Sequence, residues 1–190
     1  IAAAASLEYS MEEKLIPLFE EQNPGVKVEG SYDSSGKLQT QIEEGMEADL
    51  FFSAATKQMD VLTEEGYMKE DSEADLLENK IVAIVPKDST LELNSFEDLA
   101  NAETVALGDP DSGPAEDVEV KAETPEGSLA KPVIYPVGIL ERTEHSAEAE
   151  AFLEFLQSDE AGEIFKEYGF TPYKAAEENE TESETDTEET

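Results

Sequence analysis

The sequence predicts an α/β fold built on an open sheet of mostly parallel strands, and two observations predict it. Short apolar segments alternate along the chain with amphipathic segments of helical spacing, which is the pattern of strands and helices in parallel α/β proteins. Residues 80–86 form a nearly continuous apolar run, as expected of a strand that is covered on both faces. With 190 residues, of which 38% are hydrophobic, the chain has enough length for one domain or two small lobes with a core.

The first half of the chain contains five predicted elements after an opening strand at residues 1–5. Apolar residues recur at helical spacing from Leu7 to Phe19, and the sequence Asn23-Pro24-Gly25 ends that helix. The other four elements are a strand at 26–30, a helix at 36–45, a strand at 48–53 and a helix at 57–65 that ends at Gly66.

The second half continues the alternation as far as residue 170. The expected elements are strands at 80–86, 104–107 and 131–140, a short helix at 95–100, and helices at 146–157 and 159–168. Beyond residue 170 the apolar periodicity is lost, and residues 177–190 are a run of Glu, Thr and Ser that we expect to be disordered.

The formal net charge of −36, from 48 acidic and 12 basic residues, is far from the usual range. Residues 177–190 hold 8 of the acids and no base, so the remainder of the chain still carries 40 acids against 12 bases. Such a surface argues against binding to nucleic acid or to anionic lipid. A strongly solvated surface is the simplest explanation of the charge.

The chain has no cysteine, which excludes disulfides, thiolate metal sites and a cysteine nucleophile. No apolar run approaches the roughly 20 residues needed to span a bilayer. An export signal is not present in this chain, which opens within a predicted strand, so we expect that signal to have been removed. The expected location is extracytoplasmic, either periplasmic or lipid-anchored at the cell surface.

Two junctions between a strand and a helix are candidates for an anion site. Ser6 closes the first strand, and Ser34, Ser35 and Gly36 open the second helix. The first N–H groups of a helix have no partner within the helix, and the helix dipole favours negative charge there. The serine hydroxyls add donors without adding charge. The alternative for each serine alone is an ordinary helix N-cap. A third candidate junction lies at residues 111–115.

Other chemistry is poorly supported. Lys37 follows Gly36, but the glycine spacing of a phosphate-binding P-loop is missing and Leu38 replaces its Ser or Thr. The aspartates of residues 109–117 lack the Gly and Glu positions of a calcium loop. His145 has no nucleophile partner in a recognisable motif, so a surface position is expected. We therefore predict no catalytic residues, no metal site and no cofactor.

The serine junctions, together with residues 48–55, Met59-Asp60 and Gly108-Asp109-Pro110, resemble the molybdate-binding proteins of bacterial molybdate import systems. The resemblance covers residues 1–115 and resumes at 118–170. It implies a periplasmic-binding-protein fold of type II with two lobes and an oxyanion, molybdate or tungstate, bound between them. By the same resemblance the ligand would contact Ser6, Ser35 and Ala115, with support from Ser34, Gly36 and Ser53.

The resemblance also implies that part of the family pattern is missing. After Ala115 about sixty residues of the pattern have no counterpart, an amount comparable to a small domain. Two ligand contacts of the family, a backbone amide and a tyrosine, fall in that gap. Tyr135 corresponds to the strand that returns from the second lobe and is not a substitute for the missing tyrosine.

The expected organisation follows from these points. Lobe one comprises residues 1–80 and 134–172, a reduced lobe two with crossing strands comprises 81–133, and 173–190 form an acidic tail. The implied function is capture of molybdate or tungstate for the permease of an ABC importer, through closure of the lobes around the ligand. The alternatives are a truncated lobe that binds no ligand and one that takes another oxyanion or a small organic acid. Apolar surface left exposed on lobe one would favour a homodimer.

Overall fold

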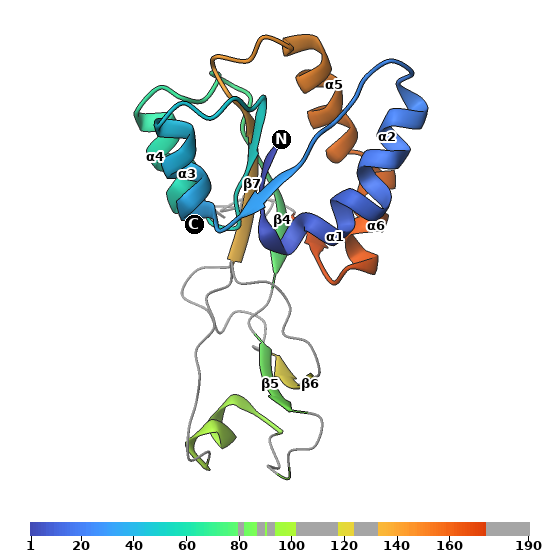
Figure 1. Cartoon of the computed structure of the whole chain (residues 1–190). Helices are drawn as coiled ribbons and strands as arrows, with labels where there is room; N and C mark the ends of the chain where they lie inside the picture. Colours follow the sequence, from blue (N-terminus) through green and yellow to red (C-terminus); the bar gives the residue numbers. More distant parts are fainter. Residues whose placement is uncertain (80–81, 87–89, 91–93, 102–117, 124–132, 174–190) are drawn as a thin grey trace, which may run out of the picture.

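The computed structural model describes residues 1–79, 82–86, 90, 94–101, 118–123 and 133–173 (Figure 1). Its strands are β1 (Ala2–Ala4), β2 (Ser31–Asp33), β3 (Leu50–Phe52), β4 (Ala74–Asn79), β5 (Val82–Pro86), β6 (Val118–Glu123), β7 (Val133–Ile139) and β8 (Thr171–Pro172). Its helical segments are η1 (Ala5–Leu7), α1 (Glu8–Ser10), η2 (Met11–Leu15), α2 (Ile16–Gln22), α3 (Ser35–Glu43), α4 (Thr56–Glu64), η3 (Phe96–Asn101), α5 (Ser146–Leu156) and α6 (Asp159–Glu167).

The strands form two sheets of unequal size. The main sheet has six strands in the order β2-β1-β3-β7-β4-β8, and the small sheet pairs β5 with β6. Strands β1, β2 and β3 are parallel, as predicted, whereas β7 is antiparallel to both β3 and β4. The main sheet is therefore mixed, because β7 is the strand by which the chain returns from the small sheet. Figure 1 shows the small sheet beyond the end of β4 and β7.

Helices cover both faces of the main sheet. Figure 1 shows α1, α2, α5 and α6 on one side and α3 and α4 on the other. The first side holds the larger core cluster, in which the Phe19 and Phe152 rings have centroids 4.7 Å apart. The second side holds a smaller cluster with Leu38, Ile42 and Met59 at its centre. Of these residues, Phe19, Phe152, Leu38 and Ile42 are ones that the helical spacing places on buried faces.

The first predicted helix is confirmed, but it is not a regular α-helix. Its turns change from 3₁₀ in η1 through α1 to a π-helix in η2 and back to α in α2. Pro17 lies in the first turn of α2. Because proline has no N–H and its ring clashes with the preceding turn, the wider π turn before it keeps the helix continuous. Leu7, Met11 and Leu15 stay buried throughout.

The strand predicted at residues 26–30 is wrong, since the strand lies at Ser31–Asp33. The N–H of Val28 donates to the Glu20 carboxylate at 2.9 Å, and the N–H of Val26 donates to the carbonyl of Asn23. These backbone groups are thus satisfied by a side chain and a turn. Pairing with β1 begins only at Ser31.

The run at 80–86 is a strand, but the prediction that both of its faces are covered is wrong. Within β5, Ala83 and Val85 are buried whereas Val82 is 40% exposed, so the strand has one covered face. The strand that comes before β5 in the chain, β4, belongs to the main sheet and had no predicted counterpart. Its six residues include Asp75 and Glu78 and only one buried residue, Leu77, so the apolar signal is weak.

The other described elements agree with the predictions within a few residues at each end. These are β1, α3, β3, α4, β7, α5 and α6, and the short helix expected at 95–100 is the 3₁₀ segment η3. Strands β6 and β8 were not predicted. The strand expected at 104–107 and the tail at 177–190 lie outside the described residues, and the lobe boundaries stay a prediction. Among the described helices, none has the length and apolar character needed to cross a membrane.

Candidate functional site

Three parallel strands end side by side at the edge of the main sheet from which the chain continues toward β5 (Figure 1). The register pairs Ala4 of β1 with Asp33 of β2, and Ala3 with Phe52 of β3. The residues that follow these strands therefore start from nearly the same level. In open α/β sheets this edge, where the chain crosses to opposite sides of the first strand, is the usual place for a ligand.

Ser35, the first residue of α3, is fully buried at this edge. Its Oγ accepts a hydrogen bond of 2.9 Å from the backbone N–H of Ala54, just after β3. Within the described part of the chain, no acceptor is found for its own hydroxyl proton. A buried hydroxyl normally uses its proton, so a free one here is a potential donor to a ligand.

Ser6, the second residue of η1, is half-buried and contacts a residue from another part of the chain. Its Oγ lies 3.2 Å from the Oη of Tyr135 on β7. Tyr135 is 2% exposed, and its ring packs edge-on against Phe170 with centroids 5.3 Å apart. This tyrosine was assigned to the returning strand without a role at the site. The sequence signal that could have found it is a tyrosine within an apolar, buried strand, because a buried tyrosine hydroxyl usually has a hydrogen-bond partner.

Ser53 is fully buried and turns the chain after β3. Its Oγ donates to the carbonyl of Ala55 at 2.7 Å and accepts from the N–H of Ala55 at 3.1 Å. The proton and one lone pair of this hydroxyl are thus both used within the turn. The Ser53 side chain therefore shapes the turn that presents the Ala54 N–H to Ser35, and it has no proton left for a ligand.

Ser34 and Gly36 flank Ser35 at the start of α3. Ser34 occupies the N-cap position, but its side chain makes no capping hydrogen bond. A Cβ added to Gly36 would meet no atom within 4 Å, so the helix start is open on that side. The third predicted contact, Ala115, lies outside the described residues, and its role stays a prediction.

An acid–base pair lies next to the start of α3. The Asp33 carboxylate accepts a 2.7 Å bond from the N–H of Ser34 and lies 3.0 Å from the Lys37 ammonium. The Ser34 N–H, followed by Lys37, holds the pKa of Asp33 below its ordinary value of 3.8. Lys37 thus compensates the one carboxylate at this helix start, which an incoming anion would otherwise meet unpaired.

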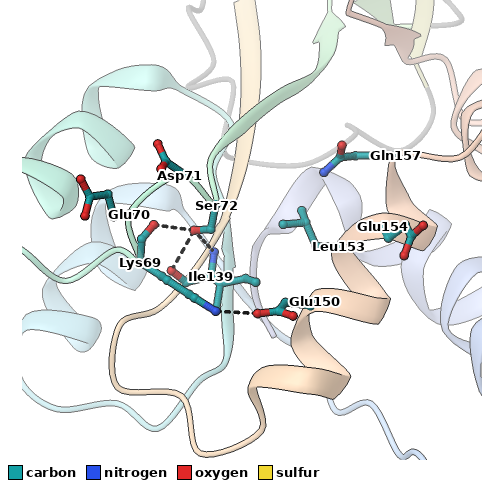
Figure 2. A pocket seen from close by; sticks show the side chains of 9 residues that line it. All are labelled: Lys69, Glu70, Asp71, Ser72, Ile139, Glu150, Leu153, Glu154 and Gln157. Carbon is teal, nitrogen blue, oxygen red and sulfur yellow. Dashed lines mark hydrogen bonds and ion pairs between the residues drawn. The ribbon is translucent and has the colours of Figure 1, made fainter.

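A separate hollow of about 300 Å³ lies on the flank of the main sheet, between the loop before β4 and α5 (Figure 2). Lys69 reaches across it to Glu150 at 2.5 Å, and the hydroxyl of Ser72 is bonded to the carbonyl of Lys69 at 2.7 Å. Its other charged lining residues are Glu70, Asp71 and Glu154. An acidic rim with its only cation already paired does not suit an anion.

The described residues also bear on a metal site and on the position of His145. Among the described residues, no group of three or more His, Asp or Glu side chains could hold a metal ion. The side chain of His145 is 67% exposed, and its Nδ1 lies 3.2 Å from Asp49 Oδ1, so its predicted surface position is confirmed.

Comparison with known proteins agrees with this arrangement. The family model described as "Bacterial extracellular solute-binding protein" matches residues 1–122 and, in a second segment, 116–171. The two segments together cover most of the chain. The chain belongs to this family.

Two curated relatives and one solved structure narrow the likeness within the family. YvgL of Bacillus subtilis, assigned as an ABC transporter substrate-binding lipoprotein, is 33% identical over 227 residues, covering 90% of this chain and 85% of YvgL. The molybdate-binding protein ModA of Escherichia coli is 31% identical over 229 residues, covering 90% and 88%. The substrate-binding domain assigned to a molybdenum ABC transporter of Clostridium difficile shares 26% identity and a TM-score of 0.74, covering 91% and 97%.

These findings confirm a ModA-like solute-binding protein with the fold of periplasmic binding proteins. The relatives are binding proteins and not enzymes, as was predicted for this chain. The alignment with YvgL spans 227 positions but includes only 90% of 190 residues, about 171, so about 56 positions of YvgL face no residue here.

Proposed function

We propose that this solute-binding protein captures a tetrahedral oxyanion, molybdate or tungstate, outside the cytoplasmic membrane and delivers it to the permease of an ABC importer. The observation that carries the proposal is the buried hydroxyl of Ser35: its oxygen accepts from the Ala54 N–H, and its proton has no acceptor among the described residues. A second hydroxyl, that of Ser6, lies just after the end of β1, the strand that pairs with β2. The molybdate-binding relative supports the choice of ligand.

Neutral donors suit a dianion in a protein as acidic as this one. Each hydrogen bond to a charged group contributes about 1.5–3 kcal/mol, so a few converging donors are enough for firm binding. The net charge of −36 opposes the approach of an anion. Charges more than about 8 Å from the site are largely screened at physiological salt, which limits that opposition.

The mechanism is closure of the second lobe over the edge of the main sheet, which excludes water and adds donors such as Ala115. Discrimination against sulfate comes from the size of the closed cavity, since sulfate has the same charge and the same tetrahedral shape as molybdate and tungstate. The protein acts in the periplasm or anchored at the cell surface. A homodimer through an exposed face of lobe one stays a prediction, which light scattering would test.

A second candidate is a lobe without a competent ligand site. It is favoured by the 56 or so positions of YvgL that have no residue in this chain. If those positions supply the rest of the donor cage, Ser6 and Ser35 are left as a half-site that competes with water for the anion. This candidate has the same fold and the same stability without ligand, so only binding separates the two.

Thermal unfolding with an excess of molybdate, tungstate or sulfate at matched ionic strength tests the proposal. A ligand at one hundred times its dissociation constant stabilises by about 2.7 kcal/mol. For a protein of this size the expected increase in Tm is several degrees, at about 2–4 °C per kcal/mol. Shifts with molybdate and tungstate that exceed the shift with sulfate support capture. A cooperative transition that no anion moves supports the second candidate.

A further inference from the structure

The Ser6 hydroxyl lies next to the Tyr135 hydroxyl, which determines whether Ser6 donates or accepts a hydrogen bond toward a ligand. Tyr135 Oη lies 3.2 Å from Ser6 Oγ, and either atom could donate. Tyr135 is 2% exposed, and in the described part of the chain Ser6 is the only hydrogen-bond partner of its hydroxyl. A phenol is a stronger acid than an alcohol and is therefore the better donor of the two. The favoured arrangement is Tyr135 O–H donating to Ser6 Oγ.

From this contact we infer that Tyr135 is a positioning residue that fixes Ser6 as a hydrogen-bond donor to the bound anion. Once the Tyr135 proton occupies a lone pair of Ser6, the Ser6 proton points elsewhere. Ser6 is the more exposed member of the pair, so its hydroxyl is the one that a ligand can reach. Chains of hydrogen bonds polarise one another, which makes the Ser6 proton a stronger donor.

The same arrangement occurs at the second serine. The Ala54 N–H donates to Ser35 Oγ at 2.9 Å, in the same way as the Tyr135 hydroxyl donates to Ser6 Oγ. Each serine thus accepts one hydrogen bond from the protein and can donate its own proton to a ligand. Among the described residues, both serines are therefore set to donate to a ligand, and each oxygen keeps one lone pair.

A site whose serines are set to donate favours tetrahedral anions that carry no proton. Molybdate and tungstate are fully deprotonated dianions near neutral pH and accept from every direction. Hydrogen phosphate brings a proton of its own, for which each serine has only its second lone pair, so it accepts fewer hydrogen bonds from this site than a dianion without a proton. Tyr135 therefore contributes to selectivity without touching the ligand.

The inference rests on the proposed function and is tested with Tyr135→Phe. This variant removes Oη and keeps the ring that packs against Phe170. Isothermal titration with molybdate should show affinity lowered about three- to tenfold, the value of one hydrogen bond. At mildly alkaline pH, where phosphate is HPO4²⁻, the preference for molybdate over phosphate should fall as well, because both lone pairs of Ser6 become available to accept.

Two further variants separate positioning from structural effects. Tyr168→Phe removes a tyrosine hydroxyl that donates to Glu13 at 2.8 Å on the helical layer, and it should change neither affinity nor preference. Ser6→Ala removes the residue through which Tyr135 acts, so Tyr135→Phe should have no further effect on molybdate binding in that background.

Three results would overturn the inference. They are an unchanged molybdate affinity and anion preference in Tyr135→Phe, an equal loss for molybdate and phosphate, or a full further loss when Tyr135→Phe is added to Ser6→Ala. If the wild-type chain binds none of the anions, the proposed function fails and this inference fails with it. If the wild type binds and Tyr135→Phe behaves like the wild type, this inference alone fails.

Discussion

The main sheet and the small sheet differ in how much of the molecule supports them. The main sheet has helices on both faces and aromatic residues at its core, such as Phe52 and Phe165 with ring centroids 6.1 Å apart. The small sheet consists of two strands, and Val82 on β5 is 40% exposed. Ser6, Ser35 and Tyr135 all belong to the main sheet and its helices. The candidate donors are therefore held by the part of the chain with the stronger core.

Phe52→Ala against Val85→Ala is the strongest test of this difference. Phe52 is fully buried in the main core, and truncation of a buried phenylalanine costs about 3–5 kcal/mol. Val85 lies in β5 and outside both core clusters of the described residues, so Val85→Ala should change the main unfolding transition by less than about 0.5 kcal/mol. Chemical denaturation followed by far-UV circular dichroism measures both. Equal destabilisation by the two changes would mean that the sheets unfold as one unit.

Ser35→Ala asks whether the main sheet holds the binding energy as well as the core. Removing a donor to a charged ligand should weaken molybdate binding by about 1.5–3 kcal/mol, or roughly 10- to 100-fold. Ser72→Ala is the matched control, because Ser72 is also buried and hydrogen-bonded but lies at the flank in Figure 2. It should lower the Tm without changing the affinity. A similar loss of affinity in both variants would point to general loosening of the fold.

Asp33→Asn tests the electrostatics at the start of α3 and has the smallest expected effect. The folded pKa of Asp33 is lowered, so its contribution to stability is present above its ordinary value of 3.8 and is lost as the pH falls through the folded value. The difference in Tm between wild type and Asp33→Asn should be small at neutral pH and disappear in acid. Glu163→Gln, which removes an exposed partner of Lys166, is the control for general charge effects. A difference that grows on acidification would contradict the sign of the shift.

Local patterns in the sequence predicted the parts of this fold whose cause is local. The helices α3 to α6 follow from apolar spacing, and Ser6 and Ser35 follow from the strand ends that precede them. The site residues so predicted still need a ligand to test them. Strand β4 was missed because its sheet position depends on β7 and β8, far along the chain.

The contact between Ser6 and Tyr135 shows most clearly what local sequence patterns do not predict. The two residues are 129 positions apart, and β7 reaches the site only because it takes its place next to β3 in the sheet. No spacing rule links them. The Ala54 N–H behind Ser35 is a similar case, since a backbone donor carries no signal in the residue type.

The position of β7 between β3 and β4 has a consequence for how freely the segment that connects β4 to β7 can change in length. The main sheet is closed across the 53 residues numbered 80–132, which lie between the end of β4 and the start of β7. The entropy lost in closing a flexible loop grows only with the logarithm of its length, by about 0.6 kcal/mol for each doubling. An insertion of some 56 residues at this place, equal in number to the unmatched positions of YvgL, would about double the interval. On closure entropy alone, a change of this size in the segment between β4 and β7 would therefore have little effect on the stability of the main sheet.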